Sequence, residues 1–263
     1  MGRRTGIKRW FSMKFTINTK EFLKLLEKSL LKGKYITSGG MKSKALSDFV
    51  QLVAGDGLTV YNADDSTIVK IKYDCVIEEK GEIIVEVNML IKYLKTMGEE
   101  TNFYGKDTVK LTSNNKKAEI PIVVIHPHYS TISMMGNKDI NFNLEMNDFI
   151  DYGSKNKQYT TALQLNSATL ADAIKACELV QSGIYTLNYN EDFTISSNLG
   201  NESYSQQIDL LRHNGDPATI SISAPVHSLF NNEIINIYMS DDVPITIVSE
   251  SAFLVRAPRI GGD

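Results

Sequence analysis

Lysines spaced one helical turn apart are the residues of this 263-residue chain best placed to do chemistry. They form a row on one expected helix, a pair on a second and a single residue on a third: Lys20, Lys24, Lys28, Lys92, Lys95 and Lys175. Lysines on one surface bind a phosphate backbone as point charges and do not read base sequence. A solvated surface explains either of the first two helices taken alone, but their shared origin in a repeated unit favours a DNA-binding face.

Other chemistry-bearing residues form no convincing site. Three close pairs could in principle bind metal: His126 and His128, Asp64 and Asp65, and Asp241 and Asp242. The histidines have no further ligand at metal-binding spacing. Each aspartate pair follows an expected strand, where turn residues belong. No phosphate-binding loop or nucleophile–base set is present, so we expect no enzyme, no metal and no cofactor.

Composition is that of a globular protein, with 42% hydrophobic and 22% charged residues. No apolar run approaches the roughly 18 residues of a membrane-spanning helix, so no membrane partner is expected. The only cysteines, Cys75 and Cys177, are typical of core thiols in a reducing compartment, although a disulfide between them stays open. We therefore expect an intracellular protein.

The net charge of −3 hides two halves of opposite sign. Residues 1–121 hold 21 Lys and Arg against 15 Asp and Glu, whereas residues 122–263 hold 7 against 16. Such asymmetry favours either contact with a polyanion on one region or head-to-tail contact between copies.

A short pattern, an alternating apolar strand that runs into an amphipathic helix, occurs four times. Its copies start at residues 15–22, 84–90, 163–168 and 220–225. The spacing pairs them two and two, which indicates an internal duplication. The sequence therefore predicts an α+β fold of two similar domains, each with antiparallel strands and two helices on one face.

The expected boundaries follow this repeat: a disordered N-terminal extension over 1–12, a first domain over 13–124, an interdomain connector over 125–162 and a second domain over 163–263. The four expected helices cover about 19–31, 88–97, 168–180 and 226–231.

Several segments resemble one known family in order along the chain. Residues 239–244 (Met-Ser-Asp-Asp-Val-Pro) and 254–260 (Leu-Val-Arg-Ala-Pro-Arg-Ile) resemble the "S-x-D-V-P" and "L-A-P-K-I" ending of the PCNA-type DNA sliding clamps. Three further segments are similar to clamp elements: 13–31, 58–73 and 198–208. The resemblance covers nearly the whole chain from Met13.

The resemblance implies a processivity factor for DNA replication and repair. It implies a head-to-tail homotrimer, a closed ring with sheets outside and helices lining a channel for double-stranded DNA. The strand near 116–124 would pair with the strand near 202–208 of a neighbouring copy. DNA polymerase, a clamp loader and other proteins would bind through a short peptide.

The resemblance also implies a pocket for that peptide beneath the connector. Its residues here would be Ala63, Ile68, Ile132, Met134, Met135, Pro244, Val255, Ala257 and Pro258. Val255 stands where the family usually has an aromatic residue, and Ala63 where it has a larger one.

The second domain departs from the family because its helices are poor in lysine. This departure favours an alternative, a clamp-like accessory factor or protein-interaction platform that does not encircle DNA. The opposite charges of the two halves favour the ring.

Overall fold

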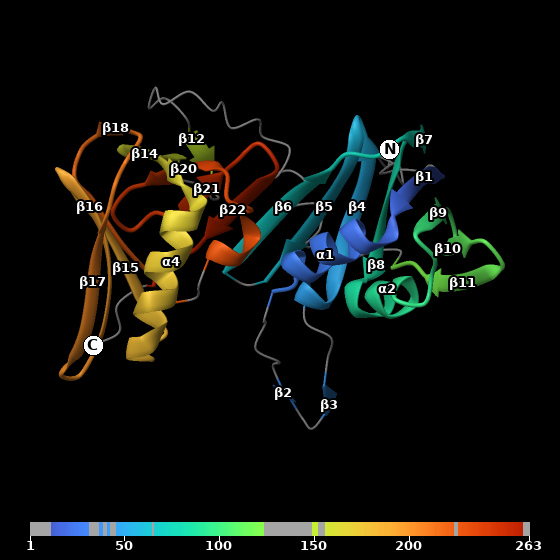
Figure 1. Cartoon of the computed structure of the whole chain (residues 1–263), viewed down its shortest axis with the longest axis horizontal. Helices are drawn as coiled ribbons and strands as arrows, with labels where there is room; N and C mark the ends of the chain where they lie inside the picture. Colours follow the sequence, from blue (N-terminus) through green and yellow to red (C-terminus); the bar gives the residue numbers. More distant parts are fainter. Residues whose placement is uncertain are drawn as a thin grey trace, which may run out of the picture. The chain divides into compact units, whose positions relative to one another are not determined.

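The computed structural model describes residues 12–31, 37–38, 41–42, 46–64, 66–123, 149–151, 156–223 and 226–259. The chain divides into two compact units. Unit 1 comprises Met1–Asp65 and Lys70–Met135, and unit 2 comprises Ser66–Val69 and Gly136–Asp263. In each unit, antiparallel strands carry helices on one side (Figure 1).

The elements of the first half alternate short strands with two helices. In chain order they are β1 (Met13–Asn18), α1 (Thr19–Ser29), β2 (Thr37–Ser38), β3 (Met41–Lys42), the 3-10 helix η1 (Leu46–Asp48), β4 (Phe49–Gly55), β5 (Gly57–Ala63), β6 (Thr67–Tyr73), β7 (Ile77–Glu79), β8 (Gly81–Glu86), α2 (Val87–Leu94), β9 (Glu100–Gly105), β10 (Thr108–Ser113) and β11 (Lys116–Pro121).

The strands of unit 1 form two groups, in the orders β11-β10-β9-β1-β7 and β6-β5-β4-β8. Strand β1 alternates strictly between buried and partly exposed residues, as expected when one face of a sheet packs on the core. Phe15 lies opposite Phe103 of β9, and their rings stack with centroids 4.4 Å apart. Both side chains are fully buried, so this pair anchors the core of unit 1.

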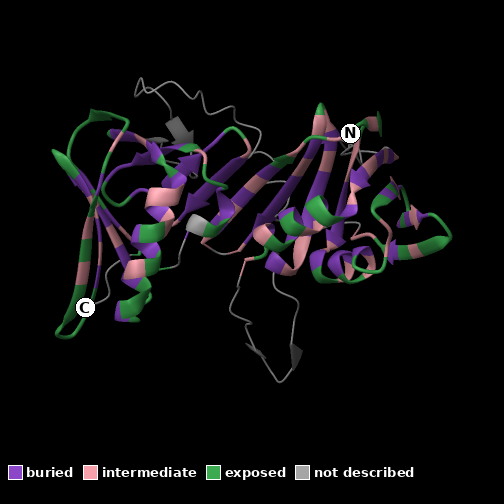
Figure 2. Cartoon of the chain, in the orientation of Figure 1, coloured by how far each residue is buried: buried purple, intermediate pink, exposed green. Residues whose placement is uncertain are grey.

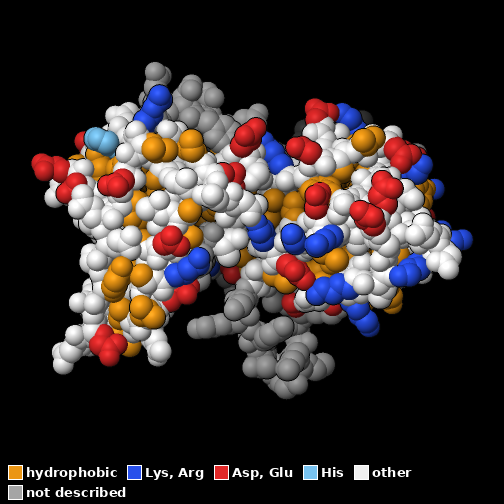
Figure 3. Space-filling view, viewed as in Figure 1, with side chains coloured by type: hydrophobic (Ala, Val, Ile, Leu, Met, Phe, Trp, Pro, Cys, Tyr) orange, Lys and Arg blue, Asp and Glu red, His pale blue; other side chains and the backbone are white. Residues whose placement is uncertain are grey.

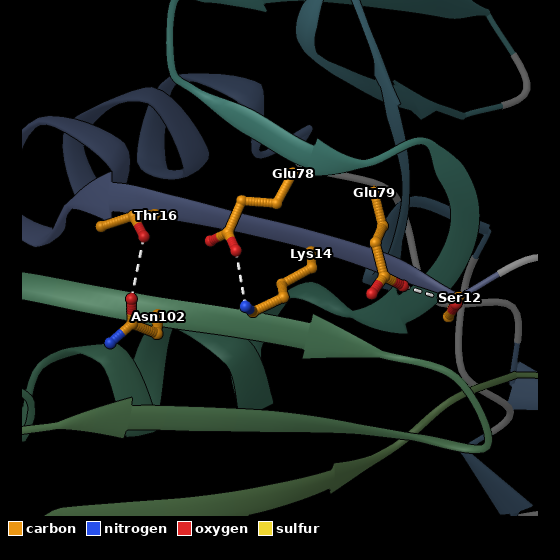
Figure 4. Close-up of polar contacts among 6 residues, drawn as sticks. All are labelled: Ser12, Lys14, Thr16, Glu78, Glu79 and Asn102. Carbon is orange, nitrogen blue, oxygen red and sulfur yellow. Dashed lines mark hydrogen bonds and ion pairs between the residues drawn. The ribbon is translucent and has the colours of Figure 1, made fainter.

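The opposite face of β1 is polar (Figure 4). The Lys14 ammonium donates to Glu78 Oε2 at 2.5 Å, and the Thr16 hydroxyl donates to Asn102 Oδ1 at 2.8 Å. The Ser12 hydroxyl donates to Glu79 Oε2 at 2.6 Å. These contacts give β1 a polar, solvent-facing side opposite its buried side.

Unit 2 takes the remaining elements. In chain order they are β12 (Phe149–Asp151), β13 (Asn156–Gln158), β14 (Thr161–Asn166), α4 (Ser167–Cys177), the 3-10 helix η2 (Glu178–Val180), β15 (Tyr185–Asn190), β16 (Asp192–Leu199), β17 (Glu202–Ile208), β18 (Arg212–Gly215), β19 (Ala218–Ile222), the 3-10 helix η3 (His227–Leu229), β20 (Ile234–Met239), β21 (Ile245–Val248) and β22 (Ala252–Arg256).

The strand orders of unit 2 repeat those of unit 1. One group runs β22-β21-β20-β14-β18 and the other β17-β16-β15-β19, so that β22 corresponds to β11 and β17 to β6. The segment Ser66–Val69, which includes the start of β6, belongs to unit 2 and lies beside β22. The predicted duplication and α+β architecture are confirmed.

Helix positions differ from the predictions at their ends. The α2 helix stops at Leu94, after which the chain tightens: the Thr96 and Met97 N–H groups donate three residues back, to the Tyr93 and Leu94 carbonyls, both at 3.0 Å. The helix predicted over 226–231 is the single 3-10 turn η3. It ends at Leu229 because the next residue, Phe230, is already extended, with φ −95° and ψ 142°. Figure 2 shows that the buried residues lie mainly in the strands, although β7, β11, β17 and β18 are largely exposed.

The expected N-terminal extension lies outside the described residues, apart from Ser12. No helix among the residues that the structure describes is long and apolar enough to cross a membrane.

Candidate nucleic-acid interface

The first helix of each unit begins at an asparagine that follows a strand. The Asn18 Oδ1 accepts a hydrogen bond from the Glu21 N–H at 3.1 Å, and the Asn166 Oδ1 accepts one from the Ala168 N–H at 2.8 Å. Such side-chain caps satisfy backbone donors that have no partner within the helix. The repeated strand–Asn–helix motif therefore fixes where α1 and α4 start.

The α1 helix buries one face and exposes its lysines. Phe22 and Leu26 are fully buried, whereas Lys20 and Lys24 are exposed. Lys28, one turn further on, is half-buried and makes a contact of its own. The predicted row thus lies along the solvent side of α1.

The α2 helix brings a second set of lysines beside the first. Lys92 and Lys95 are both exposed, and the Lys95 ammonium forms an ion pair with Glu27 of α1, with Nζ and Oε1 2.9 Å apart. The Lys92 ammonium lies 5.9 Å from the centre of the Tyr93 ring. The two helices pack side by side, so five of the six predicted lysines share one surface of unit 1.

Carboxylates also stand on this surface, which the sequence reasoning missed. Glu21 and Glu27 are exposed on α1, and Figure 3 shows lysine and acidic side chains mixed over α1 and α2. The sequence did contain a signal for Glu27. It follows Lys24 by three residues, and residues three apart on a helix lie on the same side.

The sixth predicted lysine, Lys175, is exposed on α4 of unit 2. Its ammonium lies 3.8 Å from the Asp172 carboxylate on the same helix, and Glu178 follows on the next turn. The counterpart of α2 in this unit is the short η3, which adds no helical lysine row. Unit 2 therefore offers phosphate much less positive charge than unit 1.

Some of the predicted pocket residues meet in unit 2. Val255 is buried in an apolar cluster with Tyr159, Tyr238 and Phe253, and Ile68 packs against it. The Tyr159 hydroxyl donates to the Pro244 carbonyl at 3.0 Å, which places Pro244 at the edge of this cluster. The two tyrosines were missed because nothing in their sequence surroundings distinguishes them from core aromatics.

The remaining pocket residues lie in different places. Ala257 and Pro258 are half-buried and follow β22, and the Ala257 N–H donates to the Ser66 carbonyl at 2.7 Å. Ala63 is buried in β5 of unit 1. The three residues expected from the connector, Ile132, Met134 and Met135, lie outside the described residues, as do His126 and His128.

The second aspartate pair has a turn role, as expected. The Asp241 carboxylate accepts a hydrogen bond from the Thr219 N–H at 2.7 Å, and Asp242 is left-handed with φ 57°. Within the described part of the chain, no group of His, Cys, Asp and Glu is arranged to hold a metal ion. Cys75 and Cys177 are both free thiols.

No protein-family model and no curated protein matches the chain. Solved structures do match it across nearly its whole length. The chain is similar to PCNA of A. fulgidus, solved with the C-terminal region of FEN-1, with 13% identity, a TM-score of 0.63 and coverage of 95% of this chain and 100% of that one.

Bacterial clamps match it as well. A putative DNA polymerase III beta subunit from Eubacterium rectale shares 15% identity at a TM-score of 0.70, over 98% of this chain and 67% of that one. The Helicobacter pylori beta clamp bound to a DNA ligase peptide shares 12% identity at a TM-score of 0.68, over 95% of this chain and 68% of that one. The chain therefore has the PCNA-like fold of the DNA sliding clamps.

Proposed function

We propose that this chain is a DNA sliding clamp, three copies of which close head to tail into a ring around duplex DNA. The proposal rests on the order of strands, which is the same in the two units. Two strands that lie side by side within the chain have counterparts that are both left at open sheet edges. Strand β22 lies beside the start of β6, the part of that strand that belongs to unit 2, whereas their counterparts β11 and β17 are terminal strands of their sheets in the described part of the chain.

An open strand edge carries backbone donors and acceptors that another strand can pair with. Pairing β11 of one copy with β17 of the next repeats between chains the contact that β22 makes with β6 within one chain. Contacts of this head-to-tail kind close into a ring when the rotation allows. With the domains placed over 13–124 and 163–263, three chains supply the six domains that the clamp resemblance implies.

The lysines of α1 and α2 supply the proposed contact with DNA. Lysine ammonium groups neutralise phosphates wherever they fall along the duplex, so a ring can move without sequence preference. Such a ring would tether a polymerase and so confer processivity. No catalytic role is part of the proposal, and an intracellular location follows from DNA as the partner.

The lysines exposed on α1 and α2 form what we call the lysine face of unit 1. Its contribution to DNA binding is tested by salt titration. A Lys20→Ala, Lys24→Ala, Lys28→Ala variant should bind a fluorescent duplex more weakly, and its slope of log affinity against log salt should fall by about 0.9 for each phosphate that it no longer neutralises. Lys72→Ala, Lys106→Ala, Lys110→Ala removes the same charge from exposed positions outside α1 and α2, on β6, on the β9–β10 turn and on β10, and is the matched control. Equal weakening in both variants would contradict the assignment of the helical face.

Encirclement is tested by topology. A long linear duplex is tethered at one end to a bead, the protein is allowed to thread on, and the free end is then capped with biotin and streptavidin or left open. A ring is retained in high salt only on the capped duplex, because it slides off an open end. Retention that does not depend on the cap would favour the alternative, an accessory factor that does not encircle DNA.

We further propose that partner proteins bind a peptide at the cluster around Ile68, Pro244 and Val255 of unit 2. The A. fulgidus PCNA and H. pylori clamp structures each contain a partner segment, which supports this use of the fold. The labelled FEN-1 C-terminal region is a defined probe, and Ile68→Asp should abolish its binding without altering DNA affinity. Unchanged binding by Ile68→Asp would contradict the site.

A further inference from the structure

The lysine face of unit 1 contains an acidic side chain that is paired across two helices. The Glu27 carboxylate of α1 accepts from the Lys95 ammonium of α2 at 2.9 Å, and the two side chains are 47% and 58% exposed. Glu27 follows Lys24 by three residues, so both project from the same solvent side of α1, away from the buried Leu26. A ligand that contacts Lys24 would therefore also meet the Glu27 carboxylate.

This ion pair contributes little to the stability of unit 1. Ion pairs between exposed side chains contribute little to folding because water and salt screen them. On a surface that meets phosphate the same carboxylate has a larger effect, because it occupies one ammonium group and repels the anionic ligand.

A looser pair, within one helix and not across two, lies in unit 2. On α4 the Asp172 carboxylate lies 3.8 Å from the Lys175 ammonium, and both side chains are exposed. In each unit, therefore, a carboxylate lies beside a helical lysine whose ammonium group would otherwise be available to phosphate.

We propose that Glu27 is an attenuator of DNA affinity: by holding Lys95 in an ion pair it limits the number of phosphates that unit 1 neutralises. This inference rests on the proposed function. Neutralising fewer phosphates means weaker holding at each position along the duplex, which suits a ring that must slide while closure keeps it on DNA.

The test is a gain of affinity. Glu27→Gln keeps the size of the side chain and removes its charge, so Lys95 becomes available to phosphate. The affinity for a short duplex should rise about three- to tenfold at about 50 mM salt, and the slope of log affinity against log salt should steepen by about 0.9, the value for one more neutralised phosphate. Glu250→Gln, an exposed turn position of unit 2, is the matched control and should bind like wild type.

A second variant tests whether the effect runs through Lys95. In a Lys95→Gln background, Glu27→Gln should give at most a small gain, because the ammonium that it releases is absent. A gain of the same size in both backgrounds, or no gain in the wild-type background, would overturn the attenuator role.

The outcomes also separate this inference from the proposed function. If Lys20→Ala, Lys24→Ala, Lys28→Ala weakens DNA binding while Glu27→Gln binds like wild type, the attenuator fails and the DNA face stands. If neither variant changes DNA binding, the DNA face itself is wrong.

Discussion

The N–H of Ala257 donates to the carbonyl of Ser66 at 2.7 Å, which joins the end of β22 to the start of β6 across most of the sequence. The Arg256 guanidinium adds hydrogen bonds to the Thr67 hydroxyl and, at 3.0 Å, to the Ser223 hydroxyl. Arg256 thus contacts Thr67, and Ala257 contacts Ser66. Because the numbering rises along one segment as it falls along the other, the two segments run antiparallel. This contact is the template for the contact that we propose between copies.

Applied to the open edges, the template sets the direction in which β11 and β17 meet. The end of β11 meets the start of β17, so the start of β11 lies toward the end of β17. Lys117, near the start of β11, and Asp209, just after β17, are both exposed and carry opposite charges. We expect them to attract across the proposed interface.

A charge exchange tests this attraction. Lys117→Glu or Asp209→Lys alone should weaken self-association about tenfold or less, because an opposite-charge cross-strand pair contributes about 0.2–1 kcal/mol and its replacement by like charges is destabilising. The double variant should recover part of the association, as measured by sedimentation velocity over a dilution series. Additive weakening in the double variant would contradict the proposed direction of pairing.

The stacked pair in the core of unit 1 should control the stability of the sheet that carries α1. Phe15→Ala removes a fully buried ring that stacks on Phe103, and we expect the unfolding free energy of unit 1 to fall by about 3–5 kcal/mol. Urea denaturation followed by circular dichroism measures it. Phe15→Leu, which keeps most of the volume, should cost less than Phe15→Ala, and a loss well below about 3 kcal/mol for Phe15→Ala would contradict the buried position of the ring.

Alkaline pH should destabilise unit 1 through Tyr61. Burial, with a smaller contribution from the Glu82 charge, raises the pKa of Tyr61 from 10.0 to about 12. A raised acid pKa favours the neutral folded form, so this stability is fully present below about pH 10 and is lost as pH rises toward 12. By pH 11 the decrease should be about 1 kcal/mol.

Tyr61→Phe isolates this effect from other groups that titrate in the same range. Between pH 8 and pH 11, its unfolding free energy in urea should fall by about 1 kcal/mol less than that of wild type. Parallel pH dependence in the two proteins would show that Tyr61 ionises as easily in the folded chain as in the unfolded one.

The duplication, the fold class and the first helix of each unit could be predicted from sequence because they depend on local signals. Asn18 and Asn166 mark helix starts through their caps, and Phe15 and Ile17 mark a strand by alternation. The short strands β7 and β18 could not be predicted because they are too brief to show a period and depend on pairing with β1 and β14.

The candidate site was predictable only in part, for the same reason. The spacing of Lys20 and Lys24 predicts one exposed row, but the pairing of Lys95 with Glu27 depends on two helices packing side by side. The contact of Ala257 with Ser66 likewise joins residues that no local pattern connects.

The central claim, that three copies close into a ring, is tested most directly by native mass. Light scattering at micromolar concentration should give about three times the chain mass of 29.4 kDa, and the mass should fall in the Lys117→Glu variant. A mass of 29.4 kDa at every accessible concentration would contradict the ring while leaving the clamp fold unchanged.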